Sequence, residues 1–235
     1  MKTIFLSLIL FCGNLASQTL VKVVYFPPTN LQNINDEFLR MVDSTNINKL
    51  KRLPYLDSAA AYHVRYLFER NKAALGGSGN RIYLSHYETE DLDNFTEKLN
   101  PQDRTGHPRT FEICHHATKV GAKYLNEKSA LFYKMINDQK SALELLNYIK
   151  DKHDASDIFA SYKSSPPHYE IITSNAVGYF GATTMLFGAA RFYESDREAD
   201  SMEYIFYEVN VTVFFNKAVS ESEIDSLKKM HSHHY

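Results

Sequence analysis

The 235-residue chain has no tryptophan and only two cysteines. Cys12 lies in an apolar N-terminal stretch that we expect to be removed, so the mature chain keeps Cys114 alone and cannot form an intrachain disulfide. Small secreted domains of animals and plants usually depend on disulfides. A secreted domain of this size without them is more typical of a bacterial envelope or exported protein.

An excess of positive charge is also missing, because the formal net charge is −2 and both signs are mixed along the chain. Nucleic-acid-binding proteins usually present a basic face, so we expect no nucleic-acid partner. The sequence also lacks the H-E-x-x-H, G-x-S-x-G and G-x-G-x-x-G motifs. These motifs are typical of metalloproteases, serine hydrolases and dinucleotide-binding enzymes.

Residues 1–18 have the pattern of a secretory signal peptide. Lys2 supplies the positive charge, Ile4–Cys12 the apolar core, and Ala16–Gln18 the small and polar residues near a cut. The apolar core is too short to span a bilayer, so we expect no transmembrane segment after cleavage. The sequence thus predicts a secreted, periplasmic or extracellular protein; the alternative is that residues 1–18 form an N-terminal core helix.

Beyond the signal, the apolar pattern is helical in the first part of the chain and strand-like in the last part. Residues 204–215 alternate almost without error and, with residues 179–187, predict an antiparallel hairpin with one buried face. Helices first and a hairpin last predict an α+β fold, an α-β-α sandwich with a small antiparallel sheet flanked by helices. The segments with helical spacing are 34–42, 56–67, 110–122, 129–152 and 157–162, and residues 20–26 form an edge strand or N-terminal arm.

Pro166 and Pro167 interrupt the last of these helices. Each proline lacks a backbone N–H and forces the preceding residue out of the α region. The sequence therefore predicts a rigid bend right after Ser165, followed at once by His168 and the β-branched pair Ile171-Ile172. Such a bend can point one imidazole in a fixed direction.

The order of these pieces resembles the CAP superfamily of cysteine-rich secretory and pathogenesis-related proteins, in its bacterial form. Ser165-Pro166-Pro167-His168 is similar to the Ser-Pro-Gly-His motif of that family, and Gly181 falls where its strand glycine belongs. His86 and Glu112 look like the histidine after the second helix and the glutamate of the "E-N" motif. The resemblance implies a CAP-like domain at 30–215 with a helical insertion near 119–152, preceded by an arm at 19–29 and followed by a polar, His-rich tail at 216–235.

The resemblance also implies that His86, Glu112 and His168 face one cleft, with His115 or His116 nearby. Two imidazoles and a carboxylate can fill three positions of a site for Zn²⁺ or another divalent metal. Two other readings stay open: the histidines hold the shape of the cleft by hydrogen bonding, or they act directly as acid and base. His231, His233 and His234 in the tail can also bind metal loosely.

Two function classes follow. The first is a secreted binding module whose His/Glu-lined cleft holds a divalent metal, a small apolar ligand or a cell-envelope component. The second is a secreted hydrolase that acts on peptide or cell-wall material. The second glutamate of many eukaryotic CAP proteins would fall near Ser165 and is absent, which favours the binding module. Cys114 reads as a small buried hydrophobic residue, since on a helix it would not face His115.

Overall fold

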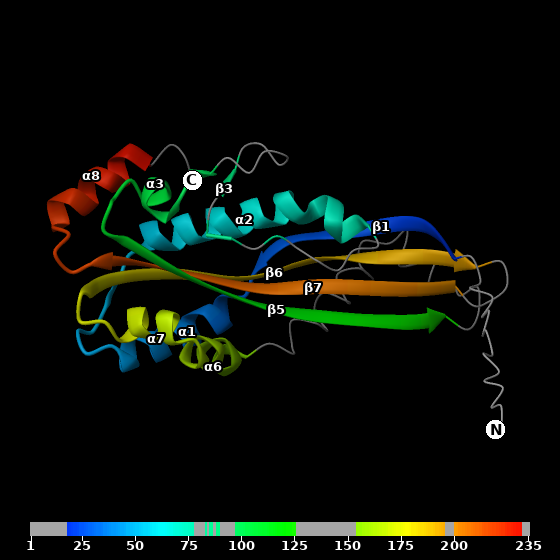
Figure 1. The fold of residues 1–235 in the computed structure, drawn as a ribbon, viewed down its shortest axis with the longest axis horizontal. Coiled ribbons are helices and arrows are strands. Elements are labelled where there is room, and N and C mark those ends of the chain that lie inside the picture. The colour runs from blue at the N-terminus through cyan, green and yellow to red at the C-terminus, as the bar shows by residue number, and fades with distance from the viewer. Residues whose placement is uncertain are drawn as a thin grey trace, which may run out of the picture.

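A central sheet carries helices on both faces (Figure 1). The computed structural model describes residues 18–77, 83, 85–86, 88–89, 97–125, 154–195 and 200–231. The strands lie in the order β1-β6-β7-β5, and all of these neighbours are antiparallel, while the short β2 runs parallel to β6. They are β1 (Gln18–Asn30), β2 (Lys51–Arg52), β5 (Thr110–Leu125), β6 (Val177–Ser195) and β7 (Asp200–Asn216).

The helices and a small second sheet complete the described part of the chain. A two-stranded sheet pairs β3 (Glu88–Thr89) with β4 (Glu97–Leu99). The helices are α1 (Gln32–Thr45), α2 (Pro54–Gly76), α3 (Pro101–Thr105), α6 (Ala155–Ser164), α7 (Pro166–Thr173) and α8 (Glu221–His231). In the described residues, no helix has both the length and the apolar character needed to span a membrane.

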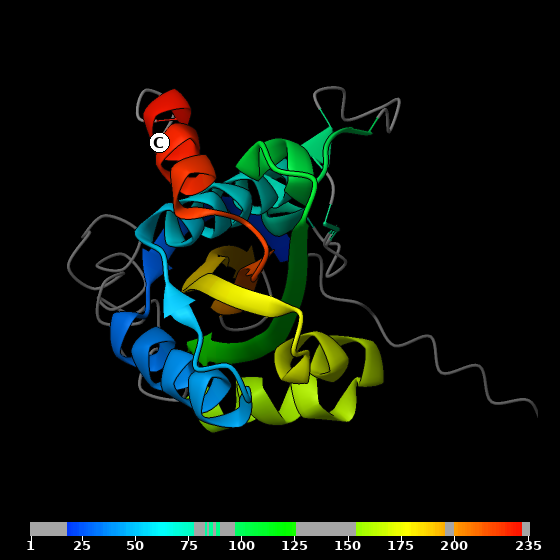
Figure 2. The same cartoon turned by 90° about the vertical axis from the view of Figure 1, so that its left-hand side faces the viewer.

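Three layers make up the fold, which confirms the predicted α-β-α sandwich. On one face, Leu56, Val64 and Leu67 of α2 share a core with Val209 and Val211 of β7. On the other face, α1, α6 and α7 share a second core with β5, β6 and β7, which includes Phe38, Ile113, Ile158, Tyr162, Ile172, Phe180 and Phe214. Figure 2 shows the same separation, with α2 on one side of the strands and α1, α6 and α7 on the other.

The hairpin of β6 and β7 is confirmed, and it is longer than the alternation indicated. Tyr179 pairs with Phe215, and the register continues to Tyr193 opposite Ser201. Alternate residues of β7 lie in the two cores, because successive side chains of a strand point to opposite faces. The two faces of this strand are therefore both buried, one against α2 and one against the other helices, so the prediction of a single buried face is wrong.

Gly181 allows the start of α2 to lie directly on β6. A Cβ atom at this position would lie 2.6 Å from the backbone nitrogen of Asp57 and 2.6 Å from the Cβ of Leu56. The Asp57 carboxylate accepts a hydrogen bond of 2.8 Å from the backbone N–H of Ala182 in the same region. The glycine is thus required by close packing.

The helix predicted for residues 110–122 is wrong. This segment is part of β5, which pairs with β7 without interruption from Thr110 opposite Phe215 to Leu125 opposite Asp200. The hydrogen bonds and side-chain contacts along sixteen paired residues stabilise the strand more than the weak helical preference of the segment stabilises a helix. The correction matters for the site, since it changes which side chains of residues 112–116 share a face.

Several boundaries also differ from the sequence-based predictions. The predicted bend is present at Ser165, but a helix that the sequence did not indicate follows it: Ser165 is the N-cap of α7 and Pro166 its first residue, a position where the missing N–H costs nothing. Pro27-Pro28 does not end β1, which tolerates them at a bulge of an edge strand. The predicted polar tail begins inside β7 and forms α8, whose Ile224 and Leu227 are buried in the α2-side core.

Residues 88–109, which none of the predicted elements covers, contain β3, β4 and α3. The helix predicted from residues 56–67 begins at Pro54 and continues to Gly76. The signal residues 1–17 and the helices predicted for 129–152 lie outside the described residues, and 119–125 of the predicted insertion belong to β5.

Candidate functional site

Glu112 and Cys114 project from β5 toward the α2 layer. They are two residues apart on a strand, so their side chains lie on the same face. Their partners on β7 are Val213 and Val211, which belong to the core that α2 covers. The Cys114 thiol lies 3.6 Å from Oε1 of Glu112 and donates to it. The two donor groups are therefore adjacent at the edge of the α2-side core.

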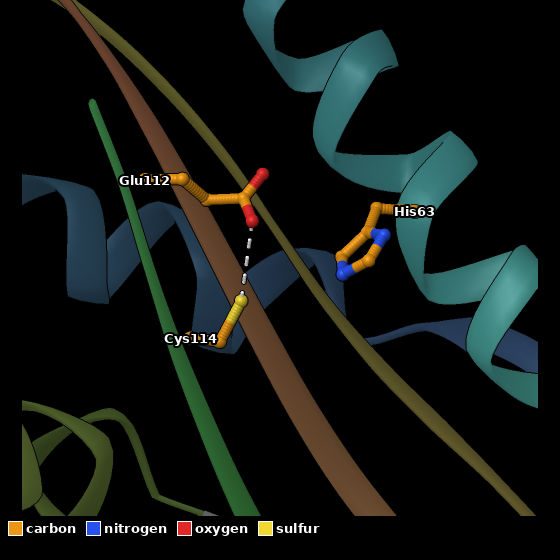
Figure 3. Close-up of side chains that lie close together, drawn as sticks. All are labelled: His63, Glu112 and Cys114. Carbon is orange, nitrogen blue, oxygen red and sulfur yellow. Dashed lines mark hydrogen bonds between the residues drawn. The ribbon is translucent and has the colours of Figure 1, made fainter. Parts of the chain in front are cut away.

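His63 reaches the same place from α2. Its side chain is fully buried, and Figure 3 shows its ring pointing toward Glu112 and Cys114. Ligand atoms of His63, Glu112 and Cys114 all lie within 4.8 Å of one another. This group can hold a metal ion. The Nε2 atom of His63 lies 2.7 Å from the carbonyl oxygen of Ser85, which only accepts, so the ring carries a proton on Nε2.

His86 lies at the solvent side of this group. Its Nδ1 atom is 3.0 Å from Oε1 of Glu112 and 3.5 Å from Sγ of Cys114. The side chain is 38% exposed, whereas that of Glu112 is 1% exposed. Two of the three residues predicted to face one cleft, His86 and Glu112, are thus in contact, and their role as metal ligands stays a prediction.

Arg104 forms the inner wall of the site. One end nitrogen of its guanidinium is ion-paired to Oε2 of Glu112, and the other donates a 2.9 Å hydrogen bond to the backbone carbonyl of His86. Burial alone would raise the pKa of Glu112, but the hydrogen bond to His86 and the charge of Arg104 outweigh it and hold that pKa below its ordinary value. Glu112 is therefore a buried carboxylate that stays ionised at neutral pH.

Cys114 is a neutral thiol in the absence of metal. Burial and, next, the negative charge of Glu112 raise its pKa well above the ordinary value. A cysteine nucleophile needs a lowered pKa, so this environment opposes covalent catalysis by the free thiol. A bound metal would reverse the situation, because a coordinating thiol loses its proton to become a thiolate.

His168 and His115 lie together on the other side of β5. The His115 and His168 rings both pack edge-on against Tyr162, with ring centroids 5.9 Å and 5.5 Å away. Tyr162 is fixed by a 2.8 Å hydrogen bond from its hydroxyl to Oδ1 of Asn210. Burial and then the neighbouring His86 lower the pKa of His168. The structure thus groups His168 with Tyr162, and its role as a metal ligand stays a prediction.

His116 shares the face of Glu112 and Cys114, because it lies two residues further along β5. The residue is exposed, and burial of part of its ring lowers its pKa. His115 alternates to the opposite face, where burial lowers its pKa as well. The strand therefore separates the two histidines that a helix would have placed closer together.

Three residues of the site escaped sequence-based reasoning. His63 lies within the segment 56–67 of helical spacing, and the one signal it offered is that a histidine on a buried helix face must find a polar partner. The sequence predicts a helix at Cys114, and on a helix residues two positions apart do not share a face. On a strand the same spacing places Cys114 and Glu112 on one face. No local signal marked Arg104, since only the folded chain brings α3 beside β5.

Comparison with protein-family models, with curated proteins and with solved structures found no match to this chain. The resemblance to the CAP superfamily accordingly stays a prediction.

Proposed function

We propose that this protein is a binding module that holds one divalent ion of the zinc class through His63, His86, Glu112 and Cys114. The spacing of the donor atoms carries the proposal. Ligands at about 2.0–2.3 Å from a tetrahedral Zn²⁺ ion lie about 3.3–3.8 Å from one another. The Cys114 sulfur is 3.5 Å from Nδ1 of His86 and 3.6 Å from Oε1 of Glu112, so two edges of that tetrahedron are already present.

The remaining edges differ more from that spacing, and His63 and His86 would have to move closer together on metal binding, because the group whose ligand atoms all lie within 4.8 Å of one another does not include His86. Nδ1 of His86 and Oε1 of Glu112 are 3.0 Å apart, which suits the hydrogen bond between them. Replacing the shared proton by a metal ion would open this pair by about 0.3–0.5 Å. His63 lies within 4.8 Å of Glu112 and Cys114, and a neutral imidazole binds a metal through the ring nitrogen that carries no proton. Binding through Nε2 would require the ring to give up its hydrogen bond to the Ser85 carbonyl.

The chemistry of the donors supports a metal of the zinc class. Thiolate and imidazole ligands favour Zn²⁺ and its transition-metal neighbours, whereas Ca²⁺ and Mg²⁺ prefer sites built from oxygen alone. Four protein ligands close a zinc site, while catalytic sites keep one position for water or substrate. The four-donor set therefore favours the binding module over the hydrolase.

The proposed module is of CAP type and acts outside the cytoplasm, after removal of residues 1–18. The three-layer sandwich and the contact between His86 and Glu112 both support a relation to that superfamily. The match is partial, since His63 and Cys114 take part here on the basis of geometry rather than of the resemblance.

Thermal unfolding of the chelator-treated full chain tests the proposal. A background in which His231, His233 and His234 are changed to glutamine removes binding by the tail. Added Zn²⁺ at about 100 times its Kd would stabilise the fold by about 2.7 kcal/mol and raise the Tm by about 5–10 °C. We expect this rise to vanish in His63→Ala and in Cys114→Ala.

The matched control is His116→Ala, which changes an exposed histidine of the same strand and should leave the rise unchanged. Each variant is compared with its own metal-free form, so loss of packing at His63 does not affect the result. An absent rise in the unmodified background, or an equal rise in Cys114→Ala, would contradict the proposal.

A further inference from the structure

The short helix α3, which carries Arg104, is held firmly in place, so the guanidinium has a fixed position in the site. The helix is closed at the start by a capping box between Asn100 and Asp103, and at the end by Gly106 in the left-handed region. The Tyr55 hydroxyl of α2 donates a 2.6 Å hydrogen bond to the carbonyl of Thr105. The Thr105 and Thr110 hydroxyls are 2.6 Å apart, which ties α3 to the first residue of β5.

The two carboxylate oxygens of Glu112 have different partners because Arg104 binds only one of them. Oε2 is occupied by the ion pair with Arg104, and both side chains are 1% exposed, so water does not compete for this contact. Oε1 faces His86 and Cys114. A metal at the donor group therefore meets one available carboxylate oxygen rather than two.

The same guanidinium also fixes the main chain at His86. Its 2.9 Å hydrogen bond to the His86 carbonyl holds the backbone from which the imidazole projects toward Glu112 and Cys114. One planar side chain thus sets the position of two donors at once, which the fork of an arginine permits and a single ammonium does not.

We propose that Arg104 is a positioning residue that keeps Glu112 a one-oxygen ligand, and so makes the site select four-coordinate zinc-class ions over ions that prefer two-oxygen carboxylate contacts. This inference rests on the proposed metal site and adds its basis of selectivity. Ca²⁺ commonly takes both oxygens of a carboxylate and six to eight ligands in all. A carboxylate with one oxygen already bonded to arginine cannot supply that geometry.

Cobalt spectroscopy of the full chain, in the background without the tail histidines, tests the proposal. Co²⁺ in the unmodified site should give the intense visible bands of four-coordination together with a thiolate charge-transfer band. Arg104→Gln removes the charge and the fork, and should weaken the visible bands as Glu112 becomes a two-oxygen ligand, while the thiolate band remains. When Zn²⁺ and Mn²⁺ compete for the site, the preference of Arg104→Gln for Zn²⁺ should be about 10- to 100-fold smaller than that of the unmodified protein.

Arg104→Lys tests whether the positive charge alone is enough or the two-pronged hydrogen bonding is needed. It also provides the test if Arg104→Gln does not fold. It keeps the positive charge but cannot bond Glu112 and His86 together, so we expect the spectrum to change as it does in Arg104→Gln. Arg65→Gln, at an exposed position of α2 two residues after His63, is the matched control and should leave spectrum and selectivity unaltered.

The outcomes distinguish this inference from the function on which it rests. If the unmodified protein gives no thiolate band, the metal site itself is wrong. If it gives the band, and Arg104→Lys keeps both the spectrum and the Zn²⁺ preference, then Arg104 does not position Glu112 and the inference is overturned.

Discussion

Replacing Glu112 with glutamine would test the buried ion pair at the centre of the site. Glutamine has nearly the same shape as glutamate, so the change removes the charge and leaves the packing. Because the Glu112 and Arg104 side chains are each 1% exposed, the variant leaves a buried guanidinium without its counter-charge. Breaking one partner of a buried pair costs about 3–5 kcal/mol. We therefore expect Glu112→Gln to lower the free energy of unfolding by that amount.

Urea unfolding followed by circular dichroism, with a chelator present so that no metal contributes, is the assay. The exposed Glu69, which pairs with Lys72 on the surface of α2, supplies the matched control. Glu69→Gln should cost no more than about 0.5 kcal/mol.

A double-mutant cycle completes this test. Arg104→Met alone should also cost about 3–5 kcal/mol, because it leaves the carboxylate buried and unpaired. The combination with Glu112→Gln removes both charges, so it should cost less than the sum of the two by about 2–3 kcal/mol. Additive effects, or a Glu112→Gln variant as stable as the unmodified protein, would refute the view that these two groups form one desolvated pair.

Three other changes test the layers and the electrostatics. Val211→Asp buries a charge in the α2-side core and should lower the free energy of unfolding, measured with urea, by about 3–5 kcal/mol. A variant as stable as the unmodified protein would argue against the pairing of β6 with β7. Gly181→Val forces a Cβ atom against the start of α2 and should lower the free energy of unfolding by about 1–3 kcal/mol. Gly77→Ala is the control and should change it little, because the new Cβ has its nearest contact at 3.5 Å. Equal losses in the two variants would contradict the close packing of α2 on Gly181. Burial holds the pKa of His115 and His168 below the ordinary 6.5, so the unfolded chain takes up these protons first and stability should fall as the pH drops below about 6.5. His168→Gln should flatten this decline in urea midpoints measured from about pH 7.5 to 5.5, and an unchanged slope would show that His168 does not contribute.

Regular local patterns explain which parts of the fold could be predicted. Tyr204–Phe215 alternates because the face of β7 toward α2 is apolar, whereas the other face carries the polar residues Glu208, Asn210 and Thr212. The helices α1 and α6 repeat apolar residues at helical spacing because each buries one side. The segment Phe111–Ala122 has no such clear period. Its strand conformation depends on pairing with residues of β7 that lie 81 to 103 positions later in the sequence, from Ala122 opposite Glu203 to Phe111 opposite Phe214, so it could not be predicted from nearby residues.

The same limit applies to the candidate site. The contact of His86 with Glu112 was anticipated through the resemblance, not through spacing, since the two residues come from different segments. Cys114 became visible as a site residue only when β5 was known to be a strand. His63 and Arg104 join the site because α2 and α3 pack on the same face as Glu112, a fact of tertiary structure with no signature in the local sequence.

Diffraction from crystals grown with Zn²⁺, measured on both sides of the zinc absorption edge, tests the central claim most directly. The account predicts one anomalous peak about 2.0–2.3 Å from donor atoms of His63, His86, Glu112 and Cys114. It also predicts that Oε2 of Glu112 still bonds Arg104 in that crystal. No peak at this position, or zinc found only at the C-terminal histidines, would contradict the account.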